Sequence, residues 1–185
     1  VEPNAEEAFR LYQIASDRGY PSAIYCLGEC YQKGIGVEKN EKEAFRLYQI
    51  ASEDDNPRAI DSLGFCYQNG IGVEKNGDEA FRLYQIASDK GNLRSTKNLG
   101  FCYEKGIGVA KNGKEAFRLY QIALDVGYIA AAKNLAFCYE NGIGTRKNID
   151  EAIRLYRIAL KGGISDASKH LSRCYKKKNP LGGPI

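Results

Sequence analysis

The stretch Asn40-Glu-Lys-Glu-Ala-Phe-Arg-Leu-Tyr48 is one of five near-copies that organise the whole chain. Its pattern, Asn-x-x-Glu-Ala-(Phe/Ile)-Arg-Leu-Tyr, returns every 36 residues and begins at Asn4, Asn40, Asn76, Asn112 and Asn148. A Cys-Tyr pair returns with the same period, at Cys30, Cys66, Cys102, Cys138 and Cys174. Fixed periods of roughly 20 to 50 residues are typical of solenoids, in which each unit buries its apolar face against its neighbours.

The first half of each repeat predicts a helix, here named helix A, over residues 41–52 of the second copy. Asn40 followed by Glu43 is a capping-box pattern: the asparagine accepts from the backbone of the first turn, and the glutamate reaches back to the asparagine amide. Apolar residues then recur at helical spacing. A glycine follows helix A in the other copies and predicts a left-handed turn, whereas the second copy carries Asp55 there, at a cost of about 1 kcal/mol.

The second half predicts helix B, over residues 58–69 of the same copy. Gly64 lies beside its apolar stripe, where glycine costs about 1 kcal/mol relative to alanine, so we expect another helix to approach closely. Residues 70–73, Gly-Ile-Gly-Val, then form a turn. The sequence therefore predicts an all-α, helix-turn-helix array over residues 4–178. Its five repeats are 4–39, 40–75, 76–111, 112–147 and 148–178, followed by an irregular tail, 179–185.

Composition narrows the class of function. Hydrophobic residues make up 43% and charged residues 27% of the chain, as in ordinary globular proteins. The net charge of +4 is spread along the repeats, so no basic stripe predicts nucleic-acid binding. No apolar run predicts a membrane helix, and no signal peptide is visible. Because residues 1–3 align with the end of an inter-repeat loop and methionine is absent, we expect a segment of a longer protein.

Six cysteines carry no disulfide pattern. Five lie at equivalent points of successive repeats, at least about 8 Å apart on stacked helices, whereas a disulfide needs Cα atoms within about 7 Å. Cys26 and Cys30 share a helix, as do His170 and Cys174. Neither pair completes a zinc site or a nucleophile with its base and orienting group. We therefore expect reduced, buried thiols, no metal and no cofactor, and a reducing, cytoplasmic setting.

The chain resembles the Sel-1-like repeat family, relatives of the tetratricopeptide repeat. The third copy carries the resemblance: Ala80, Tyr84 and Ala87 in helix A, then Leu99-Gly100 and Tyr103, then Gly106-Ile107-Gly108-Val109. The match extends over residues 4–178. It implies a right-handed α/α superhelix with helix A on the concave face, and a non-enzymatic scaffold or adaptor that binds proteins or peptides. Family members occur in quality control, bacterial host interaction and signalling.

The most suggestive surface residues lie on helix A. We name Arg10, Arg46, Arg82, Arg118 and Arg154 the arginine series, and Gln13, Gln49, Gln85 and Gln121, with Arg157 at the same position of the last copy, the glutamine series. Stacked repeats would align them for a partner's carboxylates or extended backbone. The alternative is a solvated face duplicated with each repeat.

Two other functions stay open. Cysteine-rich bacterial relatives suggest a hydrolase directed at β-lactams or peptidoglycan, but this chain lacks their second cysteine per repeat. The array also fits a passive spacer joined to a catalytic domain, such as a protein kinase, outside this chain. We expect no small-molecule substrate. Specificity should then lie where the copies disagree: the Asp55 turn, the altered last repeat, and the helix-B positions Tyr25, Asp61, Lys97, Lys133 and Lys169.

Overall fold

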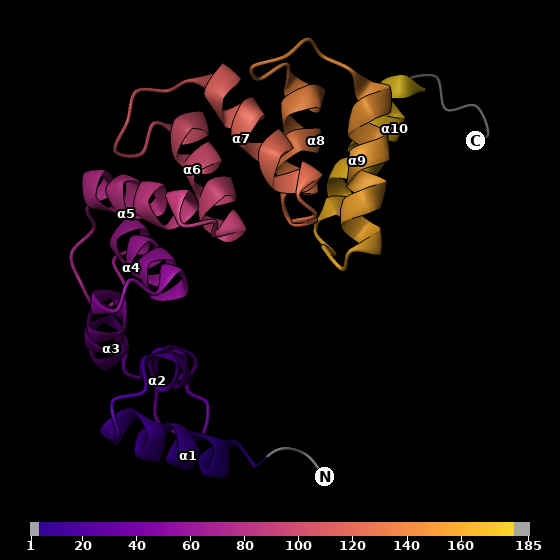
Figure 1. Cartoon of the computed structure of the whole chain (residues 1–185). Helices are drawn as coiled ribbons and strands as arrows, with labels where there is room; N and C mark the ends of the chain where they lie inside the picture. The colour runs from indigo at the N-terminus through magenta and orange to yellow at the C-terminus, as the bar shows by residue number, and fades with distance from the viewer. Residues whose placement is uncertain (1–3, 180–185) are drawn as a thin grey trace. The chain divides into compact units, whose positions relative to one another are not determined.

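The computed structural model describes residues 4–179, which form ten α helices and no strand (Figure 1). Helices A and B alternate in every repeat, so the all-α prediction is confirmed. The helices are α1 (Ala5–Asp17), α2 (Pro21–Lys33), α3 (Glu41–Glu53), α4 (Pro57–Asn69), α5 (Gly77–Asp89), α6 (Leu93–Lys105), α7 (Gly113–Asp125), α8 (Ala131–Asn141), α9 (Ile149–Lys161) and α10 (Ala167–Lys178). The predicted tail beyond Asn179 lies outside the described residues.

The repeated asparagine caps helix A, but the capping box is only half formed. The Asn40 side chain accepts from the Glu43 amide at 3.1 Å, as predicted. The Asn40 amide itself donates to the carbonyl of Tyr31, in the preceding helix B, at 2.9 Å. Because that donor is already satisfied, the Glu43 carboxylate is free to pair with Arg46 instead. The reach-back expected of the glutamate was therefore wrong.

Left-handed residues end the helices where the sequence predicts them. Gly91, after α5, has φ of 83°, and Asp55 has φ of 59° at the equivalent turn. In the turn after helix B, the second glycine allows a close approach. A Cβ on Gly72 would lie 2.1 Å from the carbonyl oxygen of Glu41 at the start of α3. The Gly-x-Gly turn thus folds onto helix A of its own repeat and is structural.

A tyrosine of helix A packs against helix B of the preceding repeat. Tyr48 and Tyr84 are fully buried, and a Cβ on Gly28 or Gly64 would lie 2.8–2.9 Å from their rings. Gly100 meets Tyr120 in the same way. The expected close approach at these glycines is confirmed.

The described chain divides into two compact units, one ending at Ser95 and the other beginning at Thr96, within α6. Each unit has its own core. In the first, Leu47, Tyr48 and Leu63 lie in one buried cluster; in the second, Leu135, Leu155 and Tyr156 do. Within both units, helix B packs more extensively on the next helix A than on helix A of its own repeat, as α4 does on α5.

Replacing Asp55 with glycine should raise the free energy of unfolding by up to about 1 kcal/mol, because glycine adopts positive φ without the Cβ clash. Urea denaturation measures the change. Gly91→Ala is the matched control: its Cβ would meet no atom within 4 Å, so only backbone strain acts, and we expect a loss of about 1 kcal/mol. A stabilising Gly91→Ala, or a destabilising Asp55→Gly, would contradict this account of the turn.

Candidate interaction surface and buried polar networks

Every member of the arginine series is paired with the glutamate three residues before it. Arg46 donates from Nε and Nη2 to the two oxygens of Glu43, at 2.9 and 2.6 Å. The same arrangement recurs at Arg10, Arg82, Arg118 and Arg154, with Glu7, Glu79, Glu115 and Glu151. Hydrogen bonding from Arg46 holds the pKa of Glu43 below its usual value. The Nε and Nη2 groups, which could bind a partner's carboxylate bidentately, are therefore already occupied by a glutamate of the same helix.

This pairing defines what the surface can bind. Each glutamate cancels the charge of its arginine, so the series exerts little long-range attraction on a polyanion. The Arg46 side chain is 57% exposed. Its Nη1 group makes no hydrogen bond to the Glu43 carboxylate, which accepts from Nε and Nη2. A fixed, neutral pair with an outward donor suits uncharged acceptors such as peptide carbonyls.

The glutamine series is also engaged in part. Gln13, Gln85 and Gln121 each donate to the aspartate one turn later, Asp17, Asp89 and Asp125, at 2.7–3.1 Å. Gln49 is exposed. Arg157 differs, because its guanidinium lies 5.7 Å from the Tyr175 ring centroid and donates to the Tyr175 hydroxyl. Arg157 therefore contacts an aromatic ring of helix B, whereas the glutamines at the same position contact an aspartate of their own helix.

All six cysteines are free thiols in the structure. Five are buried, as expected, whereas Cys26 is only partly buried. Burial raises the pKa of Cys66, Cys102 and Cys138 to about 12. Burial, and then the charge of Glu140, raise the pKa of Cys174 as well, which opposes formation of a nucleophilic thiolate. Among residues 4–179, no group of three or more His, Cys, Asp or Glu side chains is placed to hold a metal ion.

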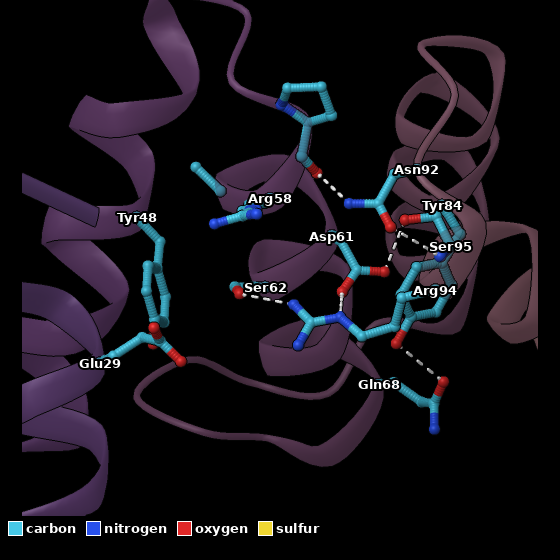
Figure 2. Close-up of polar contacts among 12 residues, drawn as sticks. Glu29, Tyr48, Arg58, Asp61, Ser62, Gln68, Tyr84, Asn92, Arg94 and Ser95 are labelled. Atoms are coloured by element: carbon cyan, nitrogen blue, oxygen red, sulfur yellow. Dashed lines mark hydrogen bonds and ion pairs between the residues drawn. The ribbon is translucent and has the colours of Figure 1, made fainter. Parts of the chain in front are cut away.

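Asp61, one of the positions at which the copies disagree, belongs to a buried network between α4 and the start of α6 (Figure 2). The residue is 1% exposed, pairs with Arg94 and accepts from Ser95 Oγ at 2.5 Å. Arg94 also donates to Ser62 Oγ at 3.2 Å. In the second unit, Lys133 and Asp166 stand at the corresponding positions with the signs exchanged, 2.6 Å apart. These positions join successive B helices.

Glu140 forms the second buried network. Its side chain is fully buried, accepts from the Tyr156 hydroxyl at 3.0 Å and pairs with Lys177 at 2.7 Å. Burial raises its pKa, but the bonds from Lys177 and Tyr156 and the charge of Arg173 outweigh burial, so the pKa is lowered overall. His170 Nδ1 lies 3.8 Å from Glu140 and has no hydrogen-bond partner among the described residues. His170 stacks on Tyr156, so it belongs to this network and not to a thiol site.

The residue after each Cys-Tyr pair was overlooked in the sequence. Gln32, Gln68, Glu104 and Glu140 accept the hydroxyl of the next repeat's buried tyrosine at 2.9–3.1 Å. The sequence does contain a signal for this role. In the first four copies the residue after Cys-Tyr is always Gln or Glu, whose side chains carry a hydrogen-bond acceptor, and in the fifth copy it is Lys176.

Comparison with protein families gives five matches to the Sel1 repeat model, at residues 1–20, 21–56, 57–92, 95–128 and 129–164. The chain belongs to the Sel1 repeat family. Such proteins form all-α repeat solenoids that generally act as scaffolds for protein interactions and are typically not catalytic. None of the described helices has the length and apolar character needed to cross a membrane.

Solved structures support the assignment. A Sel1 repeat protein from Oxalobacter formigenes is 35% identical with a TM-score of 0.87, over all of this chain and 73% of that protein. The antigen c5321 of uropathogenic Escherichia coli, with an SLR fold, is 28% identical with a TM-score of 0.75, over 96% of this chain and 38% of the antigen. The immunity protein Pa5087 of Pseudomonas aeruginosa is 26% identical with a TM-score of 0.66, over 90% and 62%. Among curated proteins, none matches significantly.

Asp61→Asn should lower the free energy of unfolding by about 2 kcal/mol, because it keeps the shape of Asp61 but leaves Arg94 without its countercharge. Denaturant titration measures the loss. The matched control is Asp166→Asn, which removes the exposed Lys133 pair and should cost less than about 1 kcal/mol. Equal effects of the two substitutions would show that burial of Asp61 contributes nothing extra.

Glu140 should make the stability depend on pH in acid. Because its folded pKa lies below the ordinary 4.5, its contribution is present above that value and is lost as pH falls through the folded pKa. Unfolding free energies measured between about pH 6 and pH 3 should therefore fall more steeply for the wild type than for Glu140→Gln. Glutamine can still accept from Tyr156, as Gln32 does from Tyr48. Parallel curves for the two proteins would contradict the assignment.

Proposed function

We propose that this Sel1 repeat chain is a protein-interaction scaffold that binds an extended segment of a partner along its exposed helix-A face. The observation that carries the proposal is the recurring Arg–Glu pair, with Nε and Nη2 held by the chain's own glutamate at 2.5–3.0 Å. The pair fixes the arginine rotamer, so little side-chain entropy remains to be lost when Nη1 meets an acceptor. Side-chain amides of the glutamine series, of which Gln49 is the most exposed, add further donors.

The proposed ligand is a peptide main chain and not a polyanion. Carbonyl groups at regular spacing match outward donors on a neutral surface, whereas nucleic acid needs an uncompensated basic stripe. The proposal therefore extends to proteins and peptides and not to nucleic acid, membranes or small-molecule substrates. The cytoplasm remains the proposed compartment, because buried free thiols suit a reducing environment.

Selection from a displayed random-peptide library, followed by affinity measurement, tests the helix-A face. Peptides that bind the wild type should lose about tenfold or more in affinity for the variant Arg46→Gln/Arg82→Gln, because two charge-assisted hydrogen bonds disappear. The control is Arg58→Gln, which removes one exposed arginine from helix B and should leave affinity within about twofold. Peptides that bind the helix-A variant as tightly as the wild type would overturn this surface assignment.

A further inference from the structure

Four of the substitutions that distinguish the last repeat from the others lie together in the structure. Ile153 replaces the phenylalanine of helix A, and Arg157 replaces the glutamine. Lys161 replaces an acidic residue, and Lys178 replaces the glycine that ends helix B. The residues they replace are Phe9, Phe45, Phe81 and Phe117; Gln13, Gln49, Gln85 and Gln121; Asp17, Glu53, Asp89 and Asp125; and Gly34, Gly70, Gly106 and Gly142.

These four positions line one open groove of about 620 Å³ between α9 and α10. Its apolar wall includes Ile153, Ile158 and Leu160, and Tyr175 faces it from α10. In earlier repeats, the phenylalanine that corresponds to Ile153 packs edge-on against the helix-B tyrosine. The ring centroids of Phe45 and Tyr67, for example, lie 5.4 Å apart. Ile153 is itself buried, so the apolar surface next to the cations comes from the partly buried Ile158, Leu160 and Tyr175.

Two of those cations lack a countercharge. In the first, third and fourth repeats, the glutamine and the acidic residue one turn later are hydrogen-bonded to each other. Here Arg157 and Lys161 stand at these positions, and neither has a carboxylate of the described chain within ion-pair distance. The other rim charges are compensated, since Arg154 pairs with Glu151 and Lys178 with Asp150, both at 2.5 Å.

We propose that the α9–α10 groove docks an acidic peptide segment of a partner protein, with an apolar side chain against Leu160 and Tyr175 and carboxylates on Arg157 and Lys161. Charge complementarity selects this occupant, because relative to a typical repeat the Gln and acid positions change from one negative charge to two positive charges that have no carboxylate partner among the described residues. The apolar wall favours a peptide over a purely ionic ligand. The proposal rests on the helix-A function only in assuming that the chain binds protein segments, although Arg154 and Arg157 belong to the helix-A series and also line this groove.

The experiment compares the wild type with a variant that restores the residues of the other repeats. Peptides selected on the wild type from a displayed random-peptide library should include an acidic, apolar-anchored class. This class should bind Arg157→Gln/Lys161→Asp at least tenfold more weakly, and added salt should weaken its binding to the wild type. The variant recreates a Gln–Asp pair that three other repeats already fold with. Ile153→Phe, which restores the larger side chain, should also weaken binding.

Two controls separate this groove from the helix-A face. Arg46→Gln/Arg82→Gln should leave the acidic class bound, whereas its loss there would point to the helix-A surface. Gln85→Arg/Asp89→Lys places the same cations on the third repeat and should create no additional site for these peptides. If only the Arg157→Gln/Lys161→Asp variant loses peptide binding, the groove assignment stands and the helix-A proposal fails. If only the Arg46→Gln/Arg82→Gln variant loses binding, the helix-A proposal stands and the groove assignment fails.

Three results would overturn the proposal. The first is a selected pool without acidic peptides, or one that binds Arg157→Gln/Lys161→Asp as tightly as the wild type. The second is equal displacement of the peptide by single-stranded RNA or by phosphatidylserine–phosphatidylcholine vesicles, which would reveal a general anion surface. The third is self-association of the wild type, measured by sedimentation, that the double variant abolishes, because the occupant would then be a second copy of the chain.

Discussion

The buried tyrosine at each junction between repeats is the contact on which the architecture depends. Tyr48, Tyr84 and Tyr120 each lie against a helix-B glycine and donate to a Gln or Glu of that same helix. At the first three junctions the ring fills the space that glycine leaves, whereas Ala136 stands at that position before the equally buried Tyr156. At all four junctions the buried hydroxyl needs an acceptor, since an unsatisfied one costs about 1–3 kcal/mol. α1, which has no helix B before it in the described chain, has no buried residue, and Tyr12 is 38% exposed.

This constraint explains the phase of the repeat. The sequence pattern begins most visibly at the asparagine cap, which suggests a unit of helix A followed by helix B. Packing is more extensive between helix B and the following helix A, and the family matches at residues 21–56 and 57–92 begin at helix B. Because helices A and B alternate along the chain, a unit that begins at either helix describes the same repeat. The physical unit of burial, however, is the helix pair that contains the tyrosine, the small residue beneath its ring (Gly, or Ala136 at the fourth junction) and the acceptor of its hydroxyl.

Local features of the fold were predictable because they depend on neighbours in sequence. Caps, left-handed turns and apolar stripes are set within one helical turn, so Asp55 and Gly64 were identified correctly. The capping box failed because the Asn40 amide finds the Tyr31 carbonyl, a competitor that only the packed structure supplies. Asp61 was noticed as an exception, but its burial depends on Arg94 from the next repeat, and a single helix pattern contains no information about that partner.

The candidate surfaces differ in what repetition says about them. The arginine series pairs with its own glutamates in all five copies, so its electrostatics are those of a neutral face at every repeat. Duplication alone preserves such a pattern. In the last repeat, Ile153, Arg157 and Lys161 change together and leave an apolar groove beside uncompensated cations. Arg157 and Lys161 are both exposed and form no ion pair among the described residues, so they contribute no charge pairing to the fold. A ligand of opposite charge can supply the missing countercharge, which is why this repeat carries the strongest argument for specificity.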